Sequence, residues 1–523
     1  MRLLLATLML AVATPALAAP PAGFDARVES LRNAFRIPGV AIAIVENGRT
    51  TLAKGYGVQG LSVPRTVDSD TIFSTGSTGK AFTTAALAIL VDRGKLGWDD
   101  KIIDHMPDFR MYDPWATREM TVRDLLVHRS GLGLGAGDLL FFPRSDLSRK
   151  ETMRRLRFIK PATSFRSAYA YDNILYSVAG QLVEEVSGEP WEAFVRHNVF
   201  APLGMDHSTV NSAGLRASPD RARPHARLSG AVRGLGQQVQ LGDEVLISDN
   251  AASAGGLAIS ANDMAKWLQV QLAHGKLPNG SRLFSEAASH EMWTPVTLQP
   301  IGDRPPALKA TRPSFSAYAL GWEIEDYKGT RIVWHGGAVF GSLAAVVLVP
   351  DRNLGFAITV NSEDGELVRG LMFELLDHYL GQPRAEWPEK YHAFKLASLT
   401  KAAGTVNAAV VARSKVGPSL LLARYAGDYS DPWYGTISIR EESGKLRIDF
   451  PHAQGMTATL DHWQYDTFQT TFADRTYEPA FVTFALDPEG RIERITMKPV
   501  SPTADFSWDY QDLLFTPVGK AIP

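Results

Sequence analysis

Hydrophobic and polar positions change their spacing several times along this chain, and each change predicts a different element. The stretch "GVAIAIVENGRTTLAKGYGVQG" reads as two strands joined at Asn47-Gly48, a dipeptide typical of hairpin turns. Between about residues 122 and 203 the apolar positions mostly follow a helical period. Three consecutive strands are then predicted in "TRIVWHGG", "SLAAVVLVP" and "GFAITVN". Strands at both ends with helices between them predict an α+β domain, whose single antiparallel sheet is closed by the two ends.

The pattern changes again after about residue 387. Residues 388–418 are rich in Ala and Lys and predict a helical or loose connector. From Tyr425 onward, short alternating segments such as "GTISIRE", "KLRIDF" and "AFVTFAL" are separated by turn residues, for example Ser443-Gly444. Six or more strands at this close spacing predict a small all-β domain, a barrel or a sandwich, over residues 419–523.

The first residues, "MRLLLATLMLAVATPALAAP", have the pattern of a secretory signal peptide. A basic Arg2 precedes an apolar core and a small-residue cleavage site, so we expect residues 1–19 to be removed. The apolar core is too short to span a bilayer, and no later run is long enough. The sequence therefore predicts a periplasmic or secreted protein without a membrane anchor, with its first domain over residues 20–387.

Composition narrows the function. The 523 residues carry a net charge of −2, so there is no overall basic field to attract nucleic acid. With no cysteine there is no thiol nucleophile, no disulfide and no thiolate metal site. The histidines show no metal-ligand spacing. We therefore expect no metal and no cofactor, and a small molecule or short peptide as substrate; a homo-oligomer stays open.

The stretch "IFSTGSTGKAFTTAALAIL", residues 72–90, holds the first candidate chemistry. A phosphate-binding loop would need glycine at position 74 and a hydroxyl residue after Lys80. The chain has Ser74 and Ala81 there, which excludes that function. Two interpretations remain for Ser77: a helix cap before the apolar helix predicted over about residues 81–91, or a nucleophile.

The nucleophile interpretation rests on the spacing S-x-x-K. Three residues apart on a helix, the Lys80 amine can reach the Ser77 hydroxyl. A lysine pKa must fall from ~10.4 to about 7–8 before the amine can take a proton, which costs on the order of 4 kcal/mol in burial and neighbouring positive charge. The spacing recurs at Ser398 and Lys401 in the connector, where we interpret it as chance, so Ser77 needs support from elsewhere.

Two later motifs supply that support. Tyr171-Asp172-Asn173 precedes an apolar helical stretch, and His335-Gly336-Gly337 ends a predicted strand. With Ser77 and Lys80 they resemble the S-x-x-K, Y-x-N and H/K-x-G elements of the serine β-lactamase and penicillin-binding superfamily. The stretches "LLVHRSGL", "VFAPLGMDHST" and "SAGGLAISANDMAKW" are similar to its class C β-lactamase-related branch, which also holds D,D-peptidases, D-aminopeptidases and esterases. The likeness spans about residues 24–380.

The resemblance implies the fold and the catalytic groups. It implies a β-lactamase/transpeptidase-like sheet with a helical region, followed by a lipocalin-like barrel of the kind often appended to these enzymes. Ser77 would attack a carbonyl and form an acyl-enzyme. Lys80 and Tyr171 would share the proton transfers, and which of them is the main base stays open.

It also implies the groups that hold the substrate. Asn173 would orient Lys80 and bind the substrate amide, with plain capping of the next helix as the alternative. His335 and Gly337 would line the strand beside the site, glycine leaving room for the substrate backbone. The backbone N–H groups of Ser77 and Ala338 would form the oxyanion hole.

The histidine is a departure, because β-lactamases of this branch usually carry lysine where His335 stands. H-x-G is more like the peptidase members and favours a peptidase or amidohydrolase acting on small peptides, with D-residues or cell-wall fragments among the candidates. An esterase or β-lactamase of the same superfamily is the alternative, and a non-catalytic penicillin-binding sensor the alternative from another class. We expect activity to change across the histidine titration range and His335→Lys to flatten that change.

Three further features stay outside the proposed site. Asp172, in the variable middle of Y-x-N, receives no role. His128 is interpreted as structural. The basic stretch 144–161 reads as an exposed charged helix, or else as a border of the cleft that attracts a substrate carboxylate.

Overall fold

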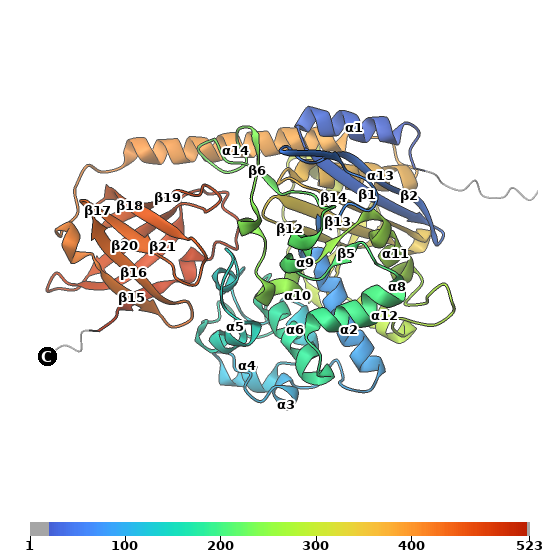
Figure 1. Ribbon diagram of the computed structural model, residues 1–523, viewed down its shortest axis with the longest axis horizontal. Coiled ribbons are helices and arrows are strands. Elements are labelled where there is room, and N and C mark those ends of the chain that lie inside the picture. Colours follow the sequence, from blue (N-terminus) through green and yellow to red (C-terminus); the bar gives the residue numbers. More distant parts are fainter. Residues whose placement is uncertain (1–19, 520–523) are drawn as a thin grey trace, which may run out of the picture.

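The computed structural model describes residues 20–519, so the predicted signal peptide lies outside the described residues. The chain forms an α+β domain and an all-β barrel, joined by the long helix α14 (Trp387–Ala412) (Figure 1). This is the predicted fold class. Within residues 20–519 none of the helices combines the length and apolar character needed to cross a bilayer.

A nine-stranded sheet forms the centre of the α+β domain. Its order is β3-β2-β1-β14-β13-β12-β11-β10-β9, so strands from the two ends of the domain pair at β1 and β14, as predicted. Val40 and Ile42 of β1 face one side and Ala41 the other, and all are buried, so both faces of the sheet are covered. The strands are β1 (Gly39–Glu46), β2 (Arg49–Gly60), β3 (Val63–Thr66), β9 (Thr297–Leu298), β10 (Ser316–Tyr318), β11 (Glu323–Tyr327), β12 (Thr330–Val339), β13 (Ser342–Val349) and β14 (Leu354–Val360).

The predicted hairpin turn between β1 and β2 is present. Asn47 and Gly48 both have positive φ, 50° and 75°, a conformation that glycine and asparagine adopt at the lowest cost. Short strands outside the main sheet form two small sheets. They are β4 (Phe73–Ser74), β8 (Ala258–Ile259) and β5 (Ser208–Thr209) in one, and β6 (His225–Arg227) and β7 (Gln238–Gln240) in the other.

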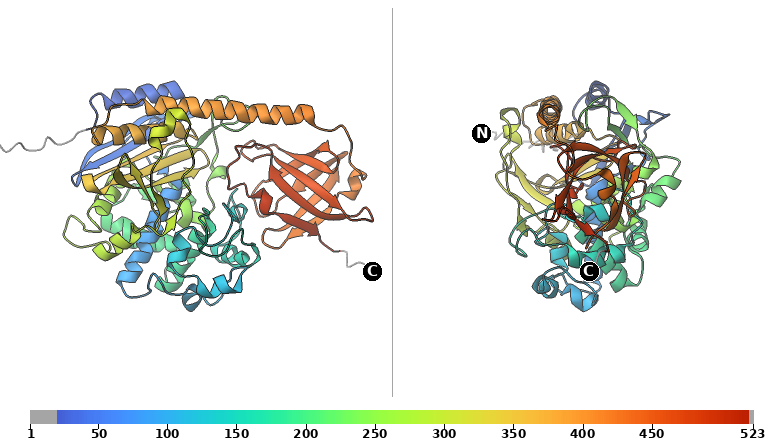
Figure 2. Two further views of the ribbon diagram at one scale, coloured as in Figure 1. Left: turned by 180° about the vertical axis from the view of Figure 1, so that it is seen from behind. Right: turned by 90° about the vertical axis from the view of Figure 1, so that its left-hand side faces the viewer.

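Helices cover the sheet on both faces (Figure 2). On one face, α1 and α13 pack their apolar positions against β1, β13 and β14. On the other, α2 is apolar nearly all round and lies at the centre of the domain. The remaining helices lie mostly on this second side. The helices of the domain are α1 (Phe24–Phe35), α2 (Lys80–Asp92), α3 (Ile102–His105), α4 (Pro114–Glu119), α5 (Arg149–Arg155), α6 (Ile174–Ser187), α7 (Trp191–Val195), α8 (Ala201–Leu203), α9 (Ser212–Ala217), α10 (Ala252–Gly255), α11 (Ala261–Leu272), α12 (Glu286–Met292) and α13 (Gly365–Tyr379).

The C-terminal domain is a closed antiparallel barrel of eight strands, in which each strand pairs with the next and β22 returns to β15. On β16, Ile437 and Ile439 are fully buried while Ser438 between them is partly exposed, which is the alternation expected for a filled barrel. The strands are β15 (Gly427–Asp431), β16 (Gly435–Glu442), β17 (Lys445–Asp449), β18 (Thr457–Gln464), β19 (Thr467–Phe472), β20 (Ala480–Leu486), β21 (Ile492–Pro499) and β22 (Leu514–Pro517).

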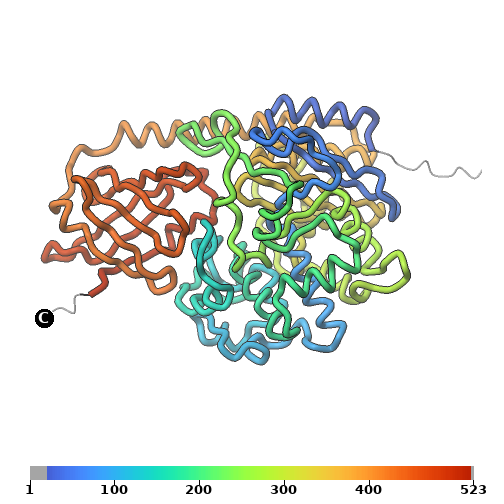
Figure 3. The backbone as a smooth tube through the Cα atoms, viewed as in Figure 1, coloured from blue at the N-terminus to red at the C-terminus, as the bar shows by residue number. Residues whose placement is uncertain are grey.

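The barrel lies beside the α+β domain and contacts it directly (Figure 3). Arg155 of α5 donates to the carbonyl of Trp433, 3.1 Å away. Arg233 donates to the carbonyl of Thr476 at 2.9 Å. A third contact is made by residues 500–513, the segment between β21 and β22, which we call the barrel segment. It reaches the loop that precedes α5, close to the candidate site.

Candidate active site

Ser77 lies in a short 3₁₀ turn, Gly76–Gly79, between β4 and α2. Gly76 has φ 53°, and a Cβ on it would lie 2.6 Å from the backbone nitrogen of Ala338, so glycine is required there. The caps of the turn and of α2 are Thr75 and Gly79, and neither forms a side-chain capping bond. The cap interpretation of Ser77 is therefore wrong, and its partly exposed hydroxyl is available for another use.

Lys80, the first residue of α2, points its amine at three oxygens. Its Nζ lies 2.9 Å from the Oγ of Ser77, 2.7 Å from the Oδ1 of Asn173 and 2.9 Å from the carbonyl oxygen of Ala254. The amide and carbonyl oxygens can only accept hydrogen bonds, whereas the hydroxyl can also donate. A neutral amine would thus donate to Asn173 and Ala254 and turn its lone pair to the hydroxyl of Ser77.

The surroundings of Lys80 lower the pKa of its amine to about 7. The cause is burial, since the side chain is completely enclosed. The expected contribution of neighbouring positive charge is not what the structure shows. Instead the nearby carboxylates of Asp138 and Asp172 oppose the shift.

Tyr171 places its phenol in the same cluster. Its ring centroid is 4.9 Å from Nζ of Lys80, and its side chain forms a hydrogen bond with Ser77. Burial raises the pKa of Tyr171 well above its usual value, although the bond with Ser77 acts in the opposite direction. The phenol therefore keeps its proton at neutral pH, which makes the Lys80 amine the more available base.

Asn173 precedes α6 without capping it. Its Oδ1 accepts from Lys80, and its Nδ2 donates to Oδ2 of Asp138 at 2.9 Å. Plain capping, the alternative interpretation of this residue, is therefore wrong. The amide instead joins the amine to a buried carboxyl.

His335 is almost completely buried on β12. Its Nδ1 lies 2.5 Å from the carbonyl oxygen of Gly336, so this nitrogen carries the hydrogen and Nε2 accepts from the hydroxyl of Tyr318 at 2.7 Å. Burial lowers the pKa of His335 to about 3, and the charge of Lys80 adds to the effect. The imidazole is thus neutral across the physiological range, which argues against the expectation that its titration controls activity.

Gly337 is required by the packing of the fold, in addition to the expected room for a substrate backbone. A Cβ on it would lie 1.9 Å from the carbonyl oxygen of Thr75, so glycine lets β12 pack against the turn that carries Ser77. Ala338, the next residue, is exposed, and its backbone nitrogen lies next to Gly76. The two segments expected to supply the oxyanion hole are therefore adjacent, and that role stays a prediction.

Asp172 does not face solvent but is fully buried behind Tyr171. Its Oδ2 accepts from the hydroxyl of Ser130 at 2.8 Å, and its backbone N–H donates to Nδ1 of His128 at 3.2 Å. The ring of His128 lies 4.1 Å from that of Tyr171, centroid to centroid. Both side chains thus support the tyrosine from behind, which agrees with a structural role for His128.

Two groups of residues were missed from the sequence. Asp138, in the apolar run "GAGDLLFF", is fully buried and accepts from Asn173 and, at 2.7 Å, from the hydroxyl of Ser507 on the barrel. Phe506 of the barrel segment packs edge-on to Tyr171, with ring centroids 5.9 Å apart. No motif spacing indicates these residues: Asp138 reaches Asn173 through the folding of the α+β domain, and Ser507 and Phe506 reach the site through the docking of the barrel.

Several arginines of the basic stretch 144–161 are bonded to other residues of the same chain. Arg149 donates to Glu192, Arg154 forms an ion pair with Glu151 at 2.7 Å, and Arg155 contacts the barrel. These contacts favour the charged-helix interpretation over a substrate-carboxylate site.

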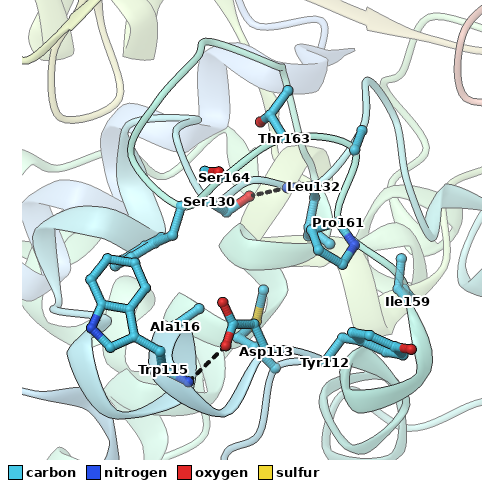
Figure 4. Close-up of a pocket in the computed structure, with 13 residues that line it drawn as sticks. Tyr112, Asp113, Trp115, Ala116, Ser130, Leu132, Ile159, Pro161, Thr163 and Ser164 are labelled. Carbon is cyan, nitrogen blue, oxygen red and sulfur yellow. Dashed lines mark hydrogen bonds between the residues drawn. The ribbon is translucent and has the colours of Figure 1, made fainter.

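A cavity of about 480 Å³ lies beside the catalytic cluster, between α4 and the loop of residues 159–165 (Figure 4). Tyr112 and Trp115 stand on its wall, and Ser130 connects it to Asp172 through their hydrogen bond. Neither Ser77 nor Lys80 lines it. The cavity therefore does not hold the proposed reacting groups.

Comparison with known proteins agrees with this geometry. A family model described as Beta-lactamase matches residues 24–380, and one described as Domain of unknown function (DUF3471) matches residues 412–517. Unguisins hydrolase ungD of Aspergillus violaceofuscus is 29% identical over 510 residues, covering 89% of this chain and 86% of its own. Penicillin-binding protein 4 of Amycolatopsis lactamdurans is 26% identical over 375 residues, covering 69% and 90%. The octameric penicillin-binding protein homologue from Pyrococcus abyssi has a similar fold, with a TM-score of 0.56 at 20% identity, over 91% of this chain and 98% of that one.

Proposed function

The chain belongs to the Beta-lactamase family of serine hydrolases, and from this premise we propose that it cleaves its substrate through an acyl-enzyme on Ser77. The observation that carries the proposal is the contact between Ser77 and a lysine whose pKa burial has lowered to about 7. At neutral pH a large fraction of Lys80 is then unprotonated, and its lone pair faces the hydroxyl that must lose a proton.

In the acylation step, the Oγ of Ser77 forms a bond to the substrate carbonyl carbon while its proton passes to Nζ of Lys80. The carbonyl oxygen becomes an oxyanion, which the backbone N–H groups of Ser77 and Ala338 would bind. The bond to the leaving group then breaks, and the leaving group takes a proton. Tyr171 is placed to pass that proton on, because its phenol is protonated and bonds to Ser77.

Deacylation repeats the sequence with water as the nucleophile. Lys80, again neutral, accepts a proton from the attacking water, and Ser77 is released with its hydroxyl restored. Each step uses groups that already lie within hydrogen-bonding distance of one another. No metal or cofactor enters this scheme.

For the substrate we propose a small peptide or amide, with D-residues or cell-wall-derived peptides as the first candidates. One observation supports this choice over a β-lactam: the neutral imidazole of His335 offers no permanent positive charge to a β-lactam carboxylate. The names of two relatives, an unguisins hydrolase and a penicillin-binding protein, do not decide between these substrates.

The test compares wild type with Ser77→Ala on a chromogenic ester, D- and L-aminoacyl amides and a penicillin, with intact-mass analysis of the protein. We expect turnover of at least one amide, an acyl adduct on wild type, and a loss of at least about 10³-fold in Ser77→Ala. Ser398→Ala, in the second S-x-x-K on α14, is the matched control and should keep full activity. Preference for the ester or the penicillin would reassign the substrate, and an adduct without turnover would indicate a sensor.

We also propose that the protein is exported and that residues 1–19 are removed. The support is the pattern of the first residues alone. Mass analysis of protein recovered from the periplasm or medium should show a chain that begins after Ala18 or Ala19. An uncut chain that stays inside the cell would overturn this proposal.

A further inference from the structure

A chain of hydrogen bonds runs from the barrel to the catalytic amine. The Oγ of Ser507 donates to Oδ2 of Asp138 at 2.7 Å, and the Nδ2 of Asn173 donates to the same oxygen at 2.9 Å. The other end of that amide, Oδ1, accepts from Nζ of Lys80 at 2.7 Å. A residue near the end of the sequence is thus three hydrogen bonds away from the proposed base.

The position of Ser507 is fixed by the docking of the barrel. The nearby Asp509 accepts from the backbone N–H of Gly137 at 2.6 Å, and the ring of Trp508 packs edge-on to Phe142 at 5.3 Å. Trp508 and Asp509 are fully buried. These contacts hold the backbone of the barrel segment against the α+β domain, so the docked barrel presents Ser507 to Asp138.

Asp138 decides which way the Asn173 amide points. An asparagine side chain has a donating end and an accepting end, which can exchange by rotation. The carboxylate oxygen of Asp138 accepts and so requires the NH₂ end, which leaves the carbonyl end for Lys80. A reversed amide would place two donors against the Lys80 amine.

We propose that Ser507 and Asp138 are positioning residues, through which the barrel holds Asn173 against the catalytic lysine. The inference rests on the proposed function of Ser77 and Lys80 and adds the barrel to that site. Without Ser507, Asp138 loses one of its two bonded donors, and the amide of Asn173 is less firmly fixed. Acylation then slows because the amine spends less time oriented towards Ser77.

The same arrangement has a charge effect that a purely structural contact would lack. Burial raises the pKa of Asp138 to about 7, while the bonds from Ser507 and Asn173 act to lower it. Removing the Ser507 hydroxyl therefore makes Asp138 hold its proton more readily. Its negative charge, which raises the pKa of Lys80, is then lost, so the pKa of Lys80 falls.

Other charged or titratable groups around this pair are unchanged by the substitution and serve as a constant background. These groups either interact electrostatically with Lys80 or Asp138 or contact the Lys80 amine. They are Tyr171, Tyr176, Asp172, His128, His335, Asp505 and Asp509. Burial holds His335, Tyr171 and Tyr176 in their neutral forms near pH 7. The titration of Lys80 therefore reports mainly on the carboxylates of Asp138 and Asp172.

The experiment measures the titration of Lys80 in the full chain by NMR of ¹³Cε-labelled lysine, with Lys80→Arg to assign the signal. The variants are Ser507→Ala and Asp138→Asn. Ser419→Ala is the matched control, because it removes a serine-to-aspartate hydrogen bond of 2.8 Å beside the barrel, to Asp466. We expect the midpoint to move down by about one pH unit in Asp138→Asn, by less in Ser507→Ala, and not at all in the control.

Two further variants separate positioning from general loss of structure. Ser507→Thr keeps a hydroxyl and should restore both the midpoint and kcat. Adding Ser507→Ala to Asp138→Asn should give no further shift, because both act through one carboxylate. On a substrate turned over by wild type, kcat should fall about tenfold in Ser507→Ala with KM nearly unchanged.

An unshifted Lys80 midpoint in Ser507→Ala and Asp138→Asn overturns the proposal, as does a shift equal to that of Ser419→Ala. A midpoint that stays displaced in Ser507→Thr, when that variant folds like wild type, counts against it as well. The NMR readout needs no turnover. Absence of any Ser77 acylation would therefore refute the proposed function, while the Lys80 titration would still decide the link to the barrel.

Discussion

Three protein oxygens, belonging to Ser77, Asn173 and Ala254, surround the amine of Lys80. Burial of a lysine normally costs stability, because its charged form loses hydration. Here that cost appears as a pKa of about 7, the value a general base needs near neutral pH. One residue thus couples the stability of the fold to the chemistry of the site.

The first prediction concerns the pH dependence of activity. Because the pKa of Lys80 is lowered to about 7, the neutral base becomes available above that pH, so kcat/KM should rise with pH with a midpoint near 7. His335→Gln should leave the midpoint in place, since the pKa of His335 lies at about 3. The measurement is a kcat/KM profile from about pH 5 to 9 for both proteins. Loss of the midpoint in His335→Gln would show that titration of the histidine, and not of Lys80, sets the pH dependence of kcat/KM.

The second prediction uses adjacent glycines as a matched pair. Gly337→Ala places a Cβ 1.9 Å from the carbonyl of Thr75, so β12 must move away from the Ser77 turn. We expect kcat/KM to fall by about 10²-fold, because displacement of about 1 Å at a catalytic group has that effect. Gly336→Ala meets only a ring atom of Trp334 at 3.5 Å and should retain activity. Equal activities of the two variants would show that the close approach does not matter.

The sequence was sufficient for residues whose roles depend on local spacing. Ser77 and Lys80 share one turn, so their contact follows from spacing, whereas their meeting with Tyr171 and Asn173 was expected only from the family resemblance. Motif spacing could not show the charge state of His335, which depends on burial by Tyr318 and the sheet. A pKa is a property of the folded environment, and spacing carries little information about it.

Helices and strands were predicted well where their buried residues recur at a regular spacing along the sequence. The strands β12, β13 and β14 and the barrel strands β16 to β21 carry a clear pattern of apolar residues and were expected, whereas β15 and β22 were not. The helix α14 was expected only as a helical or loose connector, because few of its 26 residues are buried. It stands largely in solvent, so its sequence has no strong apolar face to indicate it.

The barrel segment could not be predicted as part of the site. Its sequence, "VSPTADFSWDYQDL", reads as a loop with turn residues, and nothing in it indicates a partner. Its role follows from the way β21 and β22 aim it at the loop around Gly137. Contacts of this kind depend on the relative placement of two domains.

The third prediction belongs to this segment. Phe506 is exposed and packs edge-on to Tyr171, so its ring lies beside the proposed proton-transfer residue and is open to a ligand. Phe506→Ala should raise KM for a bulky acyl group by about fivefold through lost apolar contact, with kcat nearly unchanged. Phe394→Ala, an exposed phenylalanine of α14, is the control. Unchanged KM for both bulky and small substrates would exclude Phe506 from the substrate site.

Across the whole molecule, several buried carboxyls meet where the domains touch. Asp138 belongs to the α+β domain, and Glu478 and Asp509 to the barrel. Burial raises the pKa of Asp138 and of Glu478 to about 7, and that of Asp509 to about 10. The folded state therefore binds protons at this interface more tightly than the unfolded chain does.

The fourth prediction follows from the sign of these shifts. For a carboxyl with a raised pKa, the stabilising effect is fully present below its unfolded value and is lost as the pH rises through the folded value. The Tm of wild type should therefore fall more steeply between about pH 5 and 9 than that of Glu478→Gln, by about 3 °C over the range. Differential scanning calorimetry at matched ionic strength measures both. Parallel curves would show that Glu478 is not a source of the dependence.

The helix α14 spans about 39 Å at 1.5 Å per residue and carries the chain away from the α+β domain. The barrel then returns Ser507 to Asp138. During synthesis Ser77, the proposed nucleophile, is therefore made early, and Ser507, the proposed support of Lys80, is made late. A chain still emerging from the ribosome, or one cut within α14, would hold the nucleophile but leave Asp138 without its bond from the barrel. On the proposed link from Ser507 to Lys80, the site is complete only when both domains have folded and docked.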